Sequence, residues 1–559
     1  MTTTRCRLLL AALPALIAGA VAAAPPTTIV DLQPARRSDG VVLRDAAGRA
    51  GSATLTQLNP VINAWLLLTL QSPGRSEMAS YHLENADPPG QRIALDAEQP
   101  GQLVITRSGV SARCTFWPGN ALQEAHRSVL PYAPLCDGRL YLRNTVPGNR
   151  STLEATTEFL RDHVWRGEQI IGFVRREFYP DAFAERATPA SAAAELTPAG
   201  PPGARVLAGA ASRPVTAEGL ALDLGQGRAG LVIGRWYAVA GLDGVYASVA
   251  QPRALQALPG PALDAVEAEA LAYLVAFDLA HFELGFALGT EHPRLGWSAR
   301  VRDDMRDPAL PGPDGIADAA PLVRNGMVGP RLQARTVATF TGGFKREHGA
   351  FAHGALAAVN RGSHYGFIEQ GVVFSSLVPG LATLFVLDDG EVDMKTWTRE
   401  DQHLLGRIRH ARQNGVPLLE RDPRGGAAVP GALLDQWGAG NWSGSADERL
   451  RTLRAGACLV DDGTRRFLVY GYFSTATPRA MAQVFLAYGC RYAMHLDMNA
   501  LEHTYLALYP RSGAQVGVEH LVKGMEVLDK RVHGALVPRF LGFADDRDFF
   551  YLVSRKGTR

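Results

Sequence analysis

The stretch 477–499 constrains the fold more than any other part of this chain. Thr477 is a favourable N-cap, Pro478 suits a first helical turn, and Gly489 stands where a helix commonly ends in a left-handed residue. Residues 490–496, CRYAMHL, then have the composition of a strand. The pattern therefore predicts a capped helix that leads directly into a buried strand.

Polar residues follow at the end of that predicted strand. Since side chains alternate between the two faces of a strand, we expect His495, Asp497 and Asn499 to project from one side. Strand ends beside loops are where α/β proteins gather their chemistry. The alternative interpretation is a core strand whose polar end is only solvated.

Size and charge restrict the class of protein. A chain of 559 residues is long enough for roughly two to four domains. Hydrophobic residues make up 47% and charged residues 20%, as in soluble globular proteins. The net charge of +2 gives no basic field that would favour nucleic acid as a partner.

The N-terminus has the pattern of a signal peptide. Arg5 and Arg7 precede the apolar run 8–24, which ends in small residues of the cleavage-site type. We therefore expect residues 1–24 to be removed and the protein to be exported, to the periplasm or beyond. Retention as a membrane anchor is the alternative, although the run is short for a membrane span.

Export changes the interpretation of the cysteines. After removal of Cys6, the even number that is left favours disulfides in an oxidising compartment, and no CxxC pair indicates zinc. Four cysteines allow three pairings, of which proximity favours Cys114–Cys136 and Cys458–Cys490. A catalytic thiol is the minority interpretation.

The rest of the chain divides into regions of different amino-acid composition. Residues 25–186 are predicted to be a β-rich region, 187–204 an Ala/Pro/Gly-rich linker, and 205–559 a second domain with its core at about 270–510. A G-x-G-x-x-G match at 225–230 is followed by strand composition and not by a helix, so we reject a nucleotide-binding interpretation.

Local signals place hairpins and one more helix in the second domain. The Asp-Gly pairs within 385–390 and 458–463 lie between strand-like runs, which predicts two hairpin turns. Residues 398–412, with Thr398 as N-cap, are predicted to be helical. We therefore expect an α+β fold, a mixed β-sheet with flanking helices, preceded by the β-rich N-terminal region.

Several segments together resemble the phosphodiester glycosidase family. They are 339–345 (TFTGGFK), 380–384 (GLATL) with 389–393 (DGEVD) and Trp397, 454–458 (RAGAC), and 496–499 (LDMN). The similarity covers roughly 270–510, somewhat under half the chain. The chain departs from the family at Thr341, where the family has asparagine, and at Cys458, where it has glycine. The family's glycine-serine run after the aspartate is also missing.

The resemblance implies hydrolysis of a sugar-1-phosphodiester by an exported hydrolase. It implies catalytic roles for Asp497, His495 and Asn499 as nucleophile, acid, base or hydroxyl-binding groups. Arg454 would bind phosphate, because a guanidinium matches two phosphate oxygens. Its alternative is a surface arginine in a charged run.

The substrate-binding set also includes the Gly-rich segment and one tryptophan. Backbone N–H groups around Gly342 and Gly343, with Thr341, are expected to bind an anion, unless they form only a turn that needs positive φ. Trp442 lies in a Gly-rich loop and is expected to stack on sugar, with core packing as the alternative.

Three functional hypotheses stay open at this stage. The first is a glycosidase acting on a phosphodiester-linked sugar or a related anionic glycan, with no cofactor and no metal. The second is a non-catalytic glycan-binding or assembly protein of the bacterial envelope that keeps the fold. The third is a metal-dependent phosphodiesterase that uses His495 and Asp497.

Overall fold

A computed structural model describes residues 28–152, 154–156, 159, 181–190, 196–198, 214–298, 301, 303–345, 365–435, 450–513 and 515–555. The predicted signal peptide (1–24), most of the predicted linker (187–204) and Trp442 lie outside these ranges. Within them, no helix is long and apolar enough to cross a membrane.

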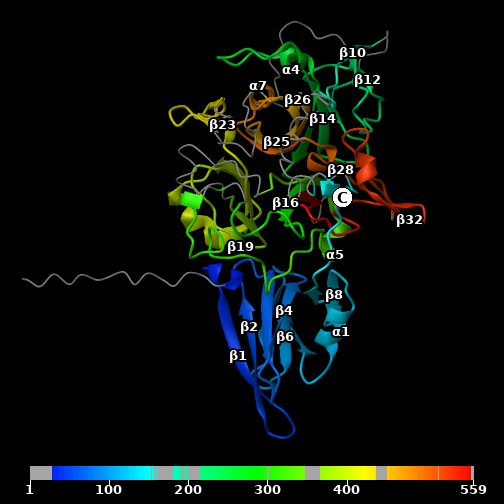
Figure 1. Ribbon diagram of the computed structural model, residues 1–559. Helices are drawn as coiled ribbons and strands as arrows, with labels where there is room; N and C mark the ends of the chain where they lie inside the picture. The colour runs from blue at the N-terminus through cyan, green and yellow to red at the C-terminus, as the bar shows by residue number, and fades with distance from the viewer. Residues whose placement is uncertain are drawn as a thin grey trace, which may run out of the picture.

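The N-terminal part consists of antiparallel β-sheets and forms the lower end of the molecule in Figure 1. Its leucine-rich strands pack against a smaller sheet and one short helix, with Leu55, Leu68, Leu83 and Ile105 in the core. The main sheet has the order β1 (Arg37–Arg44), β2 (Ala50–Gln57), β3 (Trp65–Gln71), β4 (Met78–Asn85), β9 (Leu140–Arg143) and β8 (Tyr132–Leu135). The smaller elements are β5 (Gln91–Leu95), β6 (Gln102–Arg107), β7 (Val110–Thr115) and α1 (Ala121–Arg127).

An eight-stranded sheet forms the upper layer of the C-terminal part, close to the helix α7 (Pro478–Ala487) (Figure 1). Its order is β13 (Trp236–Ala238), β14 (Val245–Ala250), β15 (Ala272–Asp278), β26 (Arg466–Ala476), β25 (Thr452–Asp461), β27 (Tyr492–Met498), β23 (Pro417–Arg421) and β24 (Ala428–Pro430).

Two five-stranded sheets complete the C-terminal core. One has the order β16 (Phe282–Ala287), β34 (Phe549–Ser554), β17 (Thr336–Thr341), β28 (Leu506–Leu508) and β31 (Glu519–His520). The other has the order β19 (Val372–Ser375), β18 (Phe367–Glu369), β22 (Ile408–Gln413), β20 (Ala382–Leu387) and β21 (Val392–Thr396). Residues of all three large sheets share one continuous hydrophobic core.

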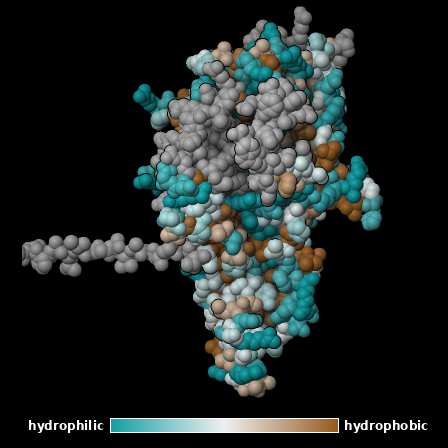
Figure 2. All heavy atoms as spheres, in the orientation of Figure 1, coloured by the Kyte–Doolittle hydropathy of each residue, from teal (hydrophilic) through white to brown (hydrophobic). Residues whose placement is uncertain are grey.

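Minor elements lie around these sheets. They are β10 (Thr188–Pro189), β11 (Val215–Thr216), β12 (Ala229–Leu231), β29 (Arg511–Ser512), β30 (Gln515–Val516), β32 (Lys530–Val532) and β33 (Ala535–Val537). The β32–β33 hairpin projects from the body, and Figure 2 shows hydrophilic and hydrophobic residues side by side on it. The 3₁₀ segments are η1 (Ile29–Leu32), η2 (Pro252–Ala254), η3 (Asp303–Met305), η5 (Arg399–Arg407), η7 (Leu501–His503) and η8 (Met525–Leu528).

The expected α+β class with a mixed sheet and flanking helices is wrong. The protein is mostly β, and every pairing between the named strands is antiparallel. The C-terminal part has, among described residues, only α4 (Ala265–Glu269), α5 (Pro330–Gln333) and α7 (Pro478–Ala487) as α-helices. The predicted helix 398–412 is a 3₁₀ segment whose last residues enter the sheet as β22, because pairing with β18 and β20 outweighs local helix propensity.

The helix α7 and the strand after it confirm the strongest sequence signal. The Thr477 hydroxyl accepts the Ala480 N–H at 3.3 Å, and Gly489 has φ of 76°. The helix packs on the eight-stranded sheet over Gly456 and Gly471, which lie opposite each other on β25 and β26. A Cβ atom on either glycine would come within about 3 Å of the Phe485 ring, so only glycine lets α7 approach the sheet this closely.

Both favoured disulfides and both predicted hairpin turns are confirmed. Cys114 is bonded to Cys136 and Cys458 to Cys490, with Cα–Cα distances of 5.5 and 5.8 Å. The Asp-Gly turns connect β20 to β21 and β25 to β26. Two disulfides are consistent with an oxidising compartment.

The N-terminal module contacts the C-terminal part through a buried charged group. Arg143 forms an ion pair with Glu84, and its guanidinium lies 4.2 Å from the centre of the Trp65 ring. Glu369 of β18 faces Arg143 at 3.8 Å and accepts the Leu288 N–H at 2.9 Å. Burial raises the pKa of Glu369 to about 7, although Arg143 opposes that shift.

We expect the stability of Glu369→Gln, measured relative to the wild type at the same pH, to be greater at pH 8 than at pH 5. A raised carboxyl pKa contributes stability that is present below the unfolded value and is lost as pH rises through about 7. The difference in stability between variant and wild type should therefore grow with pH, by on the order of 1–3 kcal/mol. Thermal melts at both pH values measure it. The exposed Glu77→Gln should show no such change, and an equal Glu369→Gln effect at both pH values would contradict the assignment.

Candidate functional site

Buried charged residues gather where three sheets meet. Thr341 pairs with Phe549, so the residues after β17 lie beside the residues before β34. The end of β27 and the η7 segment reach the same place, as does a short segment between the two modules. The central side chains are Glu154, Lys345, Asp497, Glu502, His503, Asp546 and Arg547.

Arg547 is the centre of this cluster. Its Nη1 donates to Asp497 Oδ2 at 2.6 Å, and its Nε and Nη2 donate to Glu154 Oε1 at 3.1 and 2.9 Å. Lys345 Nζ lies 2.6 Å from the same Glu154 oxygen. One guanidinium therefore joins two carboxylates, and a second cation shares one of them.

The two carboxylates differ in proton affinity. Burial raises the pKa of Asp497 to about 7, and Arg547 only partly opposes this. Burial would also raise the pKa of Glu154, but the cations Arg547 and Lys345 outweigh it and hold that pKa far below its ordinary range. Asp497 thus holds a proton near neutral pH while Glu154 stays ionised, which is the split that acid/base catalysis uses.

Three further ion pairs surround the centre. They are Arg412 with Asp548 at 2.8 Å, Arg539 with Asp545 at 2.8 Å, and Arg150 with Asp546 at 2.9 Å. Their acidic partners all come from the segment that precedes β34. Because each buried charge is paired, these groups hold the segment and Arg547 in place.

The three predicted catalytic residues do not share one side of β27. Gly456 pairs with His495 but Arg454 pairs with Met498, so β27 has an extra residue and a bulge between those positions. The ring of His495, fully buried, packs edge-on at 4.6 Å from Phe344, whereas Asp497 bonds Arg547. The bulge redirects Asp497 into the charged cluster.

Asn499 lies two residues after Asp497, and Arg454 pairs with Met498 on the neighbouring strand. Both make side-chain hydrogen bonds to groups outside the charged cluster. Asn499 has φ of 85° and accepts from the Thr452 hydroxyl at 3.2 Å. Arg454 is fully buried and donates to the carbonyls of Ala476 and Leu450, at 2.6 and 2.7 Å. Burial lowers the pKa of Arg454 to about 9, so the surface-arginine alternative is wrong.

At Gly342 and Gly343 the backbone packs closely against neighbouring residues, and neither glycine has a positive φ. The Gly342 N–H donates to the Asp548 carbonyl at 2.9 Å. A Cβ on Gly343 would lie 2.7 Å from Asn414 Oδ1, and that oxygen accepts the Phe344 N–H at 2.9 Å. The N–H groups of Gly342 and Phe344 therefore already donate hydrogen bonds within the protein. Thr341, also buried, donates to the Glu502 carbonyl at 3.3 Å.

Most residues of the charged cluster were not predicted from the sequence. Lys345 was only the last residue of a quoted motif, and Arg547 lies outside the range of the family resemblance. One local signal was available: Asp545–Asp548, DDRD, directly precedes a strongly apolar run. Such a charge run next to a buried strand indicates a buried ion-pair network.

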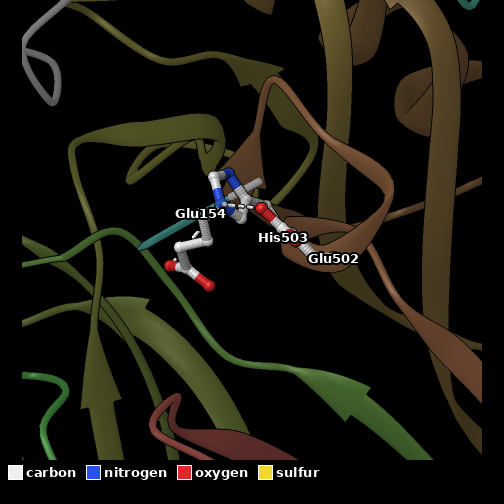
Figure 3. Close-up of side chains that lie close together, drawn as sticks. All are labelled: Glu154, Glu502 and His503. Atoms are coloured by element: carbon white, nitrogen blue, oxygen red, sulfur yellow. Dashed lines mark ion pairs between the residues drawn. The ribbon is translucent and has the colours of Figure 1, made fainter. Parts of the chain in front are cut away.

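Among the described residues, carboxylates and histidines form two groups whose ligand-type atoms lie within 4.8 Å of one another. They are Glu154 with Glu502 and His503, shown in Figure 3, and Glu154 with His292 and Asp546. Lys345 and Arg547 already bind the Glu154 oxygen, so a divalent cation would face two positive groups. The residues therefore do not fit a metal. His495 and Asp497, the pair of the metal hypothesis, belong to neither group.

A pocket of about 260 Å³ lies next to the cluster. Gly148, Thr290 and Glu291 are among the residues that line it. Glu291 forms an ion pair with Arg150, which in turn bonds Asp546. The pocket thus reaches the edge of the charged group from the side of the N-terminal module.

Comparisons with known proteins give only weak likenesses. No family model matches the chain, and no curated protein matches it. The pro-peptide-inhibited catalytic domain of zebrafish N-acetylglucosamine-1-phosphodiester alpha-N-acetylglucosaminidase is 9% identical. That match covers 57% of this chain and 85% of that one, with a TM-score of 0.30. A Burkholderia pseudomallei protein named as a putative exported protein is 11% identical over 45% of this chain and 73% of that one, with a TM-score of 0.18. Both are weak resemblances at the level of the fold.

Proposed function

We propose that the protein is an exported hydrolase that cleaves a sugar-1-phosphodiester or a related anionic glycan. The observation that carries the proposal is the bridge from Arg547 to Asp497 and Glu154, two carboxylates of opposite proton affinity. Support also comes from the sequence resemblance, whose aspartate is Asp497.

The cluster offers the groups that such a reaction needs. Phosphate is a good leaving group once its charge is neutralised, and Lys345 and Arg547 are cations that can do so. Asp497 holds a proton near neutral pH and can protonate the departing oxygen. Three of the five N–H donors of Arg547 are used in its bonds to the two carboxylates, so the guanidinium keeps donors for a substrate.

We expect the purified protein to release free reducing sugar from at least one member of a panel of sugar-1-phosphodiesters. The panel varies the sugar and keeps the acceptor constant. The matched control is a phosphodiester joined through the sugar 6-hydroxyl, which lacks the anomeric bond and should not be cleaved. If folded protein releases nothing from any member, the proposal is wrong.

A second candidate is a glycan-binding protein of the envelope without turnover. The observation in its favour is burial, since Lys345, Asp497 and Arg547 are each at most 5% exposed and already paired with one another or with Glu154. Calorimetric binding of anionic glycans without sugar release would support this candidate.

A further inference from the structure

His503 is a second histidine near Asp497, and its hydrogen bond fixes its tautomer. Nδ1 lies 2.7 Å from the carbonyl oxygen of Met498. A carbonyl oxygen only accepts, so Nδ1 carries the hydrogen. In the neutral ring Nε2 therefore has the free electron pair.

Nε2 faces the charged cluster. It lies 3.5 Å from Glu502 Oε1 and 3.9 Å from Glu154 Oε1, and Figure 3 shows the three side chains together. Within the described residues this buried nitrogen has no hydrogen-bond partner. The side chain of His503 is 18% exposed whereas His495 is fully buried, so of these two histidines His503 lies nearer to solvent.

We propose that Nε2 of His503 is the general base that activates the attacking water, an inference that rests on the proposed hydrolysis. Water donates one proton to Nε2 while its oxygen bonds to the anomeric carbon. The bond from that carbon to the phosphate oxygen breaks, and its electron pair leaves with the phosphate. The products are the free sugar and the phosphorylated acceptor, and the proton then passes from Nε2 to Glu502 or solvent.

The surrounding charges suit this role. In the part of the chain that the structure describes, the ionisable groups that act on the ring are Glu154, Glu502, Lys345 and Arg547. Burial, Arg547 and Lys345 lower the pKa of His503, and Glu154 only partly opposes them, so the ring is neutral at pH 7. Burial and Glu154 raise the pKa of Glu502, which prepares that carboxylate to receive a proton.

Kinetics on the full-length mature protein test the role. We expect His503→Gln to lower kcat by about 10²–10⁴-fold with little change in KM. It should also remove the fall in kcat/KM at acid pH, because the group that protonates there is gone. The matched control His520→Gln removes an imidazole bonded to Asp529 at 3.0 Å and should keep the wild-type pH profile.

Histidine-selective ¹⁵N NMR of the wild type gives a test that does not need a folded variant. We expect the His503 imidazole, assigned through its connection to the backbone signals, to be in the Nδ1–H form, with Nε2 unprotonated at pH 7. If His503 is in the Nε2–H form, or if His503→Gln keeps wild-type turnover, His503 is not the general base. The hydrolase proposal would then still stand. Inactivity of the wild type on every phosphodiester would instead overturn the proposed function, and the base with it.

Discussion

Asp497→Asn is expected to lower turnover at least about 10²-fold and to lower the melting temperature as well. Asp497 Oδ1 accepts the Met498 N–H at 2.8 Å, and Oδ2 accepts Arg547 Nη1 at 2.6 Å. Asparagine has only one acceptor oxygen, so its NH₂ group must face a donor at a cost of about 1–3 kcal/mol. Activity is lost because the amide cannot give up a proton near pH 7.

A matched variant separates the two effects. Asp278 is also a buried carboxylate at a strand end; its Oδ1 accepts the Ala280 N–H at 2.9 Å and its Oδ2 lies 3.5 Å from Arg465. Asp278→Asn should lower the melting temperature comparably and keep turnover. If both variants lose activity equally, stability explains the loss and Asp497 has no chemical role. Any residual activity of Asp497→Asn should lack the decline above about pH 7.

Local signals of the sequence predicted local structure well. The Thr477 cap, Gly489 and both Asp-Gly turns were placed correctly because each depends on a few neighbouring residues. The helix expected after Thr398 shows where this fails, since its last residues pair as β22 with strands more than 15 residues away. Pairing partners at that distance leave no trace in local periodicity.

The candidate site was predicted only in part, for the same reason. Asp497 was found from its place at a strand end, but the bulge that separates it from His495 depends on the register with β25. Glu154, Lys345 and Arg547 are separated by almost 400 residues of sequence, and only the folded sheets bring them together. Counting charges along the chain cannot reveal such a pairing.

Removal of Arg547 should be the most destabilising single change in this cluster. Arg547→Met keeps a long side chain but leaves Asp497 without its cation and Glu154 with Lys345 alone. Breaking a buried ion pair from one side costs about 3–5 kcal/mol, because the other charge stays buried. We expect a large drop in melting temperature, or protein that fails to accumulate in folded form.

An exposed arginine in the same arrangement serves as the control for Arg547. Arg407 bridges Asp388 and Asp389 on the β20–β21 hairpin, but its side chain is 49% exposed. Arg407→Met should cost at most about 1 kcal/mol, since solvent screens the pair. Adding Asp497→Asn to Arg547→Met should recover part of the loss, because the carboxylate that lost its cation is then removed. If Arg547→Met melts at the wild-type temperature, the charges of Arg547, Asp497 and Glu154 are hydrated and not buried together. Hydration of Asp497 would remove the burial that raises its pKa.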